Sequence, residues 1–174
     1  LGTFPVPVSI VYPVRDPRAV TASMARLDHI DFVGNQLRLI DQRPATAAEF
    51  RAERQTLAND HESPWVLHAT LWKVKSGLAP KFRRSGLPVY QFRYEDLVRD
   101  PGAVADLLNG CGLAHGAVPG AFDAVYVGSG PGGTVRTRSI DQAALMSWKT
   151  HIDGEKEADV LRVAGPLAKS FGYE

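Results

Sequence analysis

The stretch VSIVYPV at residues 8–14 runs directly into RDPRAV, and this junction constrains the fold more than any other part of the chain. In residues 8–14, both sets of alternate positions carry apolar side chains. This predicts a strand buried on both faces, as in a parallel sheet. Pro13 has no N–H for a ladder, so we expect it at the end of the strand or where pairing has stopped. Asp16 suits the cap of a helix whose first residue is Pro17. The chain therefore passes from a strand into a helix within a few residues.

The rest of the chain alternates helical segments with one more strand. Val20, Met24 and Leu27 predict the apolar stripe of the first helix, and Val160, Val163, Leu167 and Phe171 that of the last. Helices are expected at residues 17–27, 45–59, 64–76, 101–108 and 154–171, and a strand at 87–94. This order predicts an α/β fold. Because two strands make a poor parallel sheet, we expect further strands upstream, in a longer polypeptide of which this is an interior segment.

Composition limits the kinds of surface that the protein can offer. The chain has 174 residues, 44% of them hydrophobic and 22% charged, which suits one domain with a proper core. A net charge of +1 argues against a broad nucleic-acid or membrane surface. No apolar run reaches membrane-spanning length. The single cysteine, Cys111, excludes an internal disulfide framework and favours a reducing, cytoplasmic compartment without excluding others.

The tetrapeptide Val-Arg-Asp-Pro occurs twice, at residues 14–17 and 98–101, in two different contexts. In the first copy, Arg15 follows a strand and precedes a helix, where open α/β sheets bind ligands and helix amides favour anions. Its guanidinium suits a phosphate, and Ser23, eight residues on, can donate to the same anion. Arg99 of the second copy has Leu107 at that spacing, so there the Asp-Pro pair only caps a helix. Arg15 could instead pair with Asp16, and Ser23 could be a small packing residue.

Three segments together resemble one enzyme family. Arg15 and Ser23 in RDPRAVTAS resemble the 3′-phosphate motif of sulfotransferases that use 3′-phosphoadenosine 5′-phosphosulfate (PAPS), and FRYEDLVRDP resembles their second signature. GPGGTVRTRSIDQ, ALMSWKTHI and LAKSFGYE resemble the carboxyl end, most of all that of tyrosylprotein sulfotransferases and their bacterial relatives. The resemblance implies a three-layer fold related to P-loop kinases, with a parallel sheet. Residues 1–174 would be the carboxyl-terminal part of a single sulfotransferase domain, without its N-terminal strands.

The resemblance also implies an activity, namely transfer of a sulfonate group from PAPS to a hydroxyl acceptor on a protein tyrosine, a carbohydrate or a small molecule. The implied site residues are Arg15 and Ser23 on the 3′-phosphate, Tyr94 beside the adenine, Arg136 or Arg138 closing over the 3′-phosphate, and Ser139 near the sulfonate. No metal is required. The family's phosphosulfate loop and catalytic base have no counterpart in this sequence, so a missing N-terminal segment or a second copy would complete the site.

Other interpretations remain open. The chain could be a non-catalytic nucleotide-binding or structural remnant of the same fold. Tyr94 could be a core residue at a strand end, and Arg136 and Arg138 could be solvated loop charges. A kinase-like activity is disfavoured because no Gly-Lys-Ser/Thr loop is present. Core positions are the simpler reading for Trp65, Trp72 and Cys111, and the histidines lack the spacing of metal ligands.

Overall fold

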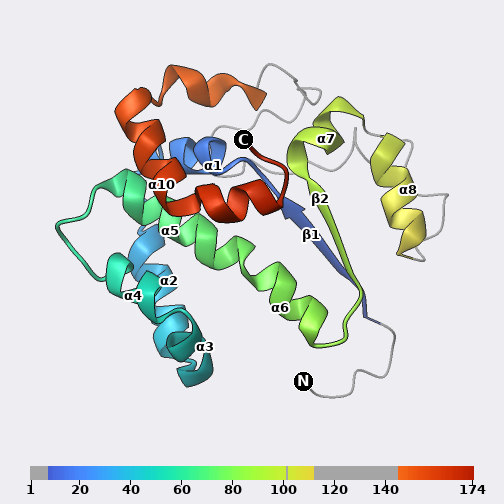
Figure 1. Cartoon of the computed structure of the whole chain (residues 1–174), viewed down its shortest axis with the longest axis horizontal. Helices are drawn as coiled ribbons and strands as arrows, with labels where there is room; N and C mark the ends of the chain where they lie inside the picture. The colour runs from blue at the N-terminus through green and yellow to red at the C-terminus, as the bar shows by residue number, and fades with distance from the viewer. Residues whose placement is uncertain (1–7, 101, 112–144) are drawn as a thin grey trace. The chain divides into compact units, whose positions relative to one another are not determined.

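The computed structural model describes residues 8–100, 102–111 and 145–174. Over these residues the chain is α/β and mostly helical, with one small sheet of two parallel strands (Figure 1). The chain divides into two compact units. The first unit comprises Leu1–Arg15 and Leu78–Gln142, and the second comprises Asp16–Gly77 and Ala143–Glu174.

Each unit contains its own set of elements. The first unit holds β1 (Ile10–Val14), α6 (Leu78–Arg84), β2 (Val89–Arg93), α7 (Tyr94–Arg99) and α8 (Gly102–Gly110). The second unit holds α1 (Pro17–Ala25), α2 (Phe32–Asp41), α3 (Pro44–Glu49), α4 (Arg51–Leu57), α5 (Pro64–Ser76), the 3₁₀ turn η3 (Ser147–Thr150) and α10 (Gly154–Ser170). The described part of the second unit therefore contains helices and their connections but no strand.

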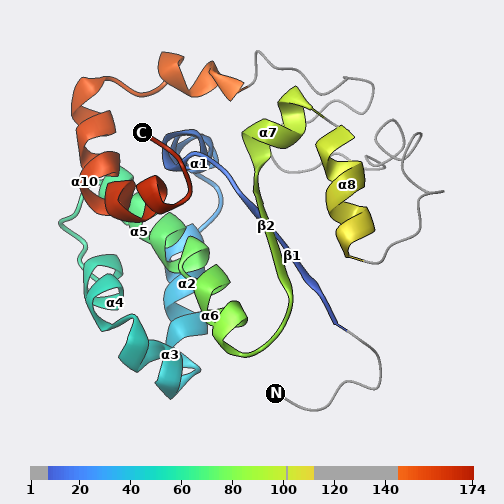
Figure 2. The same ribbon diagram turned by 45° about the vertical axis from the view of Figure 1, so that its right-hand side comes forward.

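The parallel pair of strands organises the first unit, and β1 and β2 lie side by side in both Figure 1 and Figure 2. The register aligns the last residues of the two strands, Val14 and Arg93. The Tyr90 hydroxyl donates to the Gly110 carbonyl at 2.6 Å and so joins β2 to the end of α8. The expectation of two strands in parallel order is confirmed, and the second strand ends one residue earlier than expected.

Pro13 lies inside the paired part of β1, so the expectation that it marks the end of pairing is wrong. The register continues past it to Val14. Ile10 donates its N–H to the Pro88 carbonyl at 2.9 Å, and in a parallel strand alternate residues direct their amides to the same neighbour. Pro13, three residues on from Ile10, therefore has its nitrogen on the side away from β2. Its missing N–H removes no hydrogen bond of the described ladder.

The expected burial of β1 on both faces is also wrong. Val11 is 39% exposed and Pro13 is exposed, whereas Val14 at the end of the strand is buried. Parallel strands are buried on both faces where layers cover each side of the sheet. The alternation of half-buried and exposed residues in β1 means that only one of its faces is covered by the described residues.

Helix α5 is central to the second unit and packs against α1, α4 and α10. The Ser63 hydroxyl accepts from the Val66 amide at 3.3 Å, Pro64 is the first helical residue, and Gly77 follows the last turn. This confirms the expected start and end of the helix. Its inner face is deeply buried and includes Leu71, a core residue with no exposed surface.

The buried face of α1 differs from the expected stripe of Val20, Met24 and Leu27. Val20 and Met24 are half-buried and Leu27 lies beyond the helix. Ala19 and Ala22 are buried instead, in a cluster with Trp148 of η3 and with Ile152. Small side chains let α1 approach its neighbours closely, and the choice of that face depends on partners far away in the sequence.

The buried face of α10 also differs from the expected apolar stripe. Its fully buried residues are Val160, Ala164 and Ala168. The expected stripe shares one residue with this set, and Val163, Leu167 and Phe171 are half-buried. The Phe171 and Trp72 rings still pack in a T-shaped arrangement, with 6.1 Å between ring centroids.

Several local elements were not expected from the sequence. Helices α2, α6 and α7 are additional, and the expected helix at residues 45–59 is divided into α3 and α4 at Phe50. Phe50 leaves the helical region, with φ −101° and ψ 35°. Asp31 caps α2 by accepting from the Gly34 amide at 2.8 Å.

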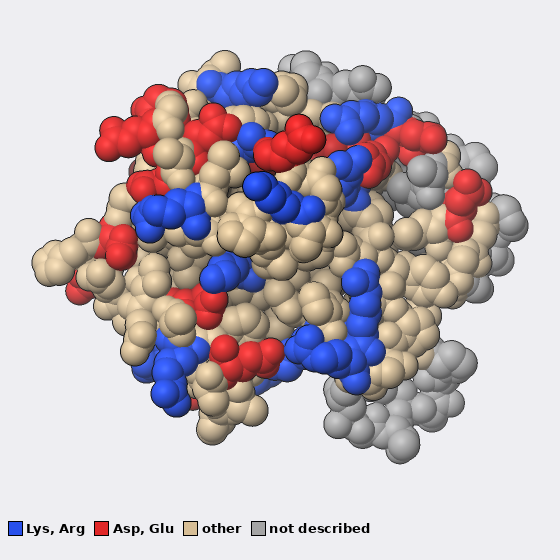
Figure 3. All heavy atoms as spheres, viewed as in Figure 1, with Lys and Arg blue, Asp and Glu red and all other residues tan. Residues whose placement is uncertain are grey.

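Charged side chains of both signs cover the second unit. Figure 3 shows acidic side chains gathered over the start of α10, where Glu155 and Glu157 occupy the first turn. Carboxylates at this end of a helix interact favourably with its dipole. Among the described residues, no helix is long and apolar enough to cross a membrane.

Candidate functional site

Arg15 and Tyr94 meet at the carboxyl end of the two parallel strands. Each residue directly follows the aligned pair Val14 and Arg93, so the register brings them to the same edge of the sheet. The guanidinium carbon of Arg15 lies 4.9 Å from the centroid of the Tyr94 ring. Both residues are half-buried. A cation–π pair of this kind contributes about 0.5–2 kcal/mol.

Tyr94 is the first residue of α7 rather than the last residue of a strand. Glu95 and Asp96 occupy the first turn of this helix. Asp96 accepts two hydrogen bonds of 2.8 Å from Arg93, and its carboxylate lies 3.5 Å from Arg99. These contacts bracket Tyr94 on both sides in the sequence. The signal that could have found the ion pair is the spacing of three residues between Arg93 and Asp96.

The first turn of α1 holds a second arginine that sequence reasoning missed. Asp16 accepts from the Arg18 backbone amide at 2.8 Å, which confirms its role as the helix cap. The Arg18 guanidinium also grips both oxygens of Asp16 and donates to Glu157 at 2.9 Å. It stacks on Trp148, 4.7 Å from the ring centroid. Hydrogen bonding to Asp16 raises the pKa of Arg18 further, burial opposes this, and hydrogen bonding to Glu157 adds to it.

The second copy of the tetrapeptide is placed differently. Arg99 is the last residue of α7 and is 56% exposed, whereas Arg15 follows a strand and is half-buried. Asp100 accepts from the Gly102 amide at 3.0 Å at the start of α8. The expectation that this copy starts a helix is therefore confirmed. Both aspartates cap helices, and the difference between the copies lies in what surrounds the arginines.

The other expected site residues have separate positions. Ser23 lies in the last turn of α1 and is half-buried, in the second unit, whereas Arg15 and Tyr94 belong to the first. The structure brings Arg15 and Tyr94 together within one unit. Arg136, Arg138 and Ser139, expected over the 3′-phosphate and the sulfonate, lie outside the described residues.

The tryptophans, the cysteine and the histidines were expected to lie outside the site. Trp72 is buried, as expected, and Trp65 is partly buried against the cluster of α1 and η3. Cys111 is half-exposed, so the expectation that it is buried is wrong. Burial lowers the pKa of His68, whose ring packs against that of Phe32 in a T-shaped arrangement. In the described parts of the chain, no group of three His, Cys, Asp or Glu residues could hold a metal ion.

Neither a scan against protein-family models nor searches of curated proteins and of solved structures return a match to this chain. Function must therefore be inferred from the residues and from the geometry of Arg15 and Tyr94.

Proposed function

We propose that the chain is part of a PAPS-dependent sulfotransferase, which transfers a sulfonate group to a hydroxyl acceptor. It would form the carboxyl-terminal part of a three-layer fold related to P-loop kinases. The observation that supports this most is the Arg15–Tyr94 pair beyond the carboxyl ends of β1 and β2. Open α/β sheets bind their ligands at this edge.

The geometry of the pair suits a nucleotide that carries a phosphate. A guanidinium that stacks on an aromatic ring directs its N–H groups outwards in its own plane, where they can form two parallel bonds with a phosphate. Tyr94 already has Arg15 against its ring, so an adenine would use the opposite face or the ring edge. In this proposal Arg15 holds the 3′-phosphate and Tyr94 lies beside the base.

The remaining roles follow from the resemblance. Ser23 donates to the 3′-phosphate, Arg136 or Arg138 closes over it, and Ser139 contacts the sulfonate. In-line transfer needs both reacting oxygens to be positioned and the charge on the leaving phosphate to be stabilised. A base must also take the proton of the acceptor hydroxyl. We assign no residue of this chain to that step.

Binding of adenosine 3′,5′-bisphosphate, measured by calorimetry, tests the proposal. The structure provides a matched pair of variants, because Arg15→Ala and Arg99→Ala remove the same residue from two copies of one tetrapeptide. Loss of a hydrogen bond to a charged group costs about 1.5–3 kcal/mol, so Arg15→Ala should weaken binding by at least about tenfold. Arg99→Ala should leave the affinity within about twofold of that of the unchanged protein, because Arg99 has no assigned role in binding.

The controls separate binding from folding and from catalysis. Circular dichroism must show that both variants are folded, and adenosine 5′-monophosphate should bind more weakly because it lacks the 3′-phosphate. Equal effects of Arg15→Ala and Arg99→Ala would refute the role given to Arg15. Tight binding without any transfer to phenolic or carbohydrate acceptors would favour a non-catalytic nucleotide-binding protein.

A further inference from the structure

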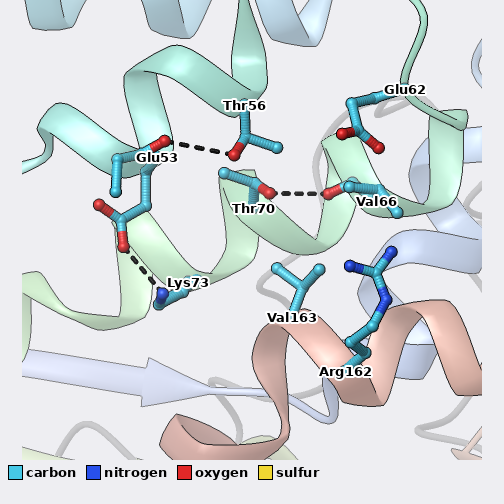
Figure 4. A pocket seen from close by; sticks show the side chains of 9 residues that line it. Glu53, Thr56, Glu62, Val66, Thr70, Lys73, Arg162 and Val163 are labelled. Atoms are coloured by element: carbon cyan, nitrogen blue, oxygen red, sulfur yellow. Dashed lines mark hydrogen bonds and ion pairs between the residues drawn. The ribbon is translucent and has the colours of Figure 1, made fainter. Parts of the chain in front are cut away.

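A second candidate site lies among the helices of the second unit. A cavity of about 220 Å³ opens between α4, α5 and α10 (Figure 4). This volume corresponds to roughly seven molecules of liquid water at ~30 Å³ each. A small organic molecule would fit the cavity, and two of the helices that form its walls, α4 and α10, pack against the third, α5.

One end of the cavity is closed by an ion pair. The Lys73 ammonium lies 2.8 Å from the Glu53 carboxylate, whose side chain is only 15% exposed (Figure 4). Burial raises the pKa of Glu53, but the hydrogen bond and the charge of Lys73, together with a backbone hydrogen bond, outweigh it, so the pKa is lowered. The two charges neutralise each other, so this end offers a ligand little net attraction.

The middle of the cavity presents two valines and two threonines. The valines are Val66 of α5 and Val163 of α10. The Thr70 hydroxyl donates to the Val66 carbonyl at 2.8 Å, and the Thr56 hydroxyl donates to the Ala52 carbonyl at 3.2 Å. Because each hydroxyl proton is used within its own helix, the threonines have no proton to offer a ligand. These walls suit a short branched hydrocarbon chain.

The other end carries two opposite charges that do not pair with each other. Glu62 and Arg162 both line the cavity, and Figure 4 shows their polar ends directed towards this end from opposite sides. Glu62 accepts one long hydrogen bond of 3.4 Å, from the Asn59 amide. One nitrogen of Arg162 donates to Asp159 at 3.1 Å, and the side chain is 62% exposed. The rest of its five-donor fork can still bind a carboxylate.

We infer that this cavity binds a free amino acid with a small apolar side chain. The amino-acid carboxylate would bind Arg162, its ammonium group would bind Glu62, and its side chain would enter between Val66 and Val163. A zwitterion binds both charges at the mouth, whereas a simple anion would contact only Arg162 and a simple cation only Glu62. The net charge of the four lining charged residues is zero, which matches a ligand of zero net charge.

Titration with L-valine, followed by methyl NMR of Val66 and Val163 and by calorimetry, tests this inference. Saturable binding with shifts at both methyl groups is expected. Glu62→Gln and Arg162→Gln should each weaken it at least about tenfold, since each removes a charged hydrogen bond. Glu155→Gln and Arg26→Gln are matched controls, because both residues are exposed and neither lines the cavity, and they should leave the affinity unchanged.

Two related compounds test the zwitterion itself. Valinamide lacks the carboxylate and isovalerate lacks the ammonium group, so each should bind at least about tenfold more weakly than L-valine. No saturation at millimolar L-valine, or equal affinity for all three compounds, would overturn the inference. So would unchanged affinity in Glu62→Gln and Arg162→Gln, because binding would then not depend on the two charges.

Discussion

Replacement of Arg18 by methionine tests the ion pairs and the cation–π contact at the first turn of α1. The guanidinium binds both oxygens of Asp16, donates to Glu157 and stacks on Trp148. Methionine keeps much of the apolar contact with the indole but removes the charge. The Asp16 carboxylate would keep its hydrogen bond with the Arg18 backbone amide.

The burial of these groups sets the size of the effect. The side chains of Arg18 and Asp16 are 17% and 12% exposed, and that of Glu157 is 35% exposed. Removal of one partner from a buried pair costs about 3–5 kcal/mol, and from an exposed pair about 0–1 kcal/mol. These groups lie between the two limits, so Arg18→Met should lower the free energy of unfolding by about 2–3 kcal/mol. For a chain of this length the midpoint of thermal unfolding should fall by about 5–10 °C.

Urea unfolding followed by tryptophan fluorescence measures this loss. All three tryptophans of the chain, Trp65, Trp72 and Trp148, belong to the second unit, so the signal reports on the unit that holds Arg18. Arg26→Met is the matched control, because Arg26 is exposed at the end of the same helix and should change stability by less than about 0.5 kcal/mol. If Arg18→Met were no more destabilising than Arg26→Met, the buried ion-pair reasoning would be refuted.

Three further predictions concern protonation and backbone conformation. Burial lowers the pKa of His68 below 6.5, so the folded state resists its protonation and loses stability as the pH falls below about 6.5; unfolding free energies of His68→Leu should show a smaller loss between pH 7.5 and 5.5. Glu53 has a lowered pKa, so its stabilising contribution is present above about pH 4.3 and is lost as the pH falls through the folded value; in Lys73→Met this part of the pH dependence should shrink. Gly86 has φ +80°, so Gly86→Ala should destabilise by about 1 kcal/mol, whereas Gly154→Ala, with open space around the new methyl group, should stabilise by about 0.4–1 kcal/mol. Thermal unfolding of the two variants should shift in opposite directions.

Signals that act within a few residues were read correctly from the sequence. Asp16 caps the helix that it was expected to cap, and Ser63 caps α5 in the same way, because a side-chain oxygen before a proline needs only the next turn of backbone. The buried faces of the helices were not predictable in the same way. Ala19 and Ala22 are buried because distant helices approach α1 there, and no pattern within α1 contains that information.

The candidate site was predictable from the sequence only in part. Arg15 directly follows the first strand and Tyr94 directly follows the second. Because the two strands are parallel, both residues lie at the same edge of the sheet. Arg93 and Arg18 were missed, although each has an aspartate two or three residues away that it grips in the structure. Such spacings become informative only when the start of the helix is known, since the helix turn brings the two side chains together.

The division of the chain into two units has a consequence for experiments on fragments. Each unit is assembled from two separate stretches of sequence, and the backbone passes from one unit to the other three times, after residues 15, 77 and 142. No single cut can therefore release either unit whole. Closure of β1 on β2 must also wait for about 74 intervening residues, an entropy cost of roughly 4 kcal/mol. Circular permutation or co-expression of complementary fragments would be required to separate the folding of one unit from that of the other.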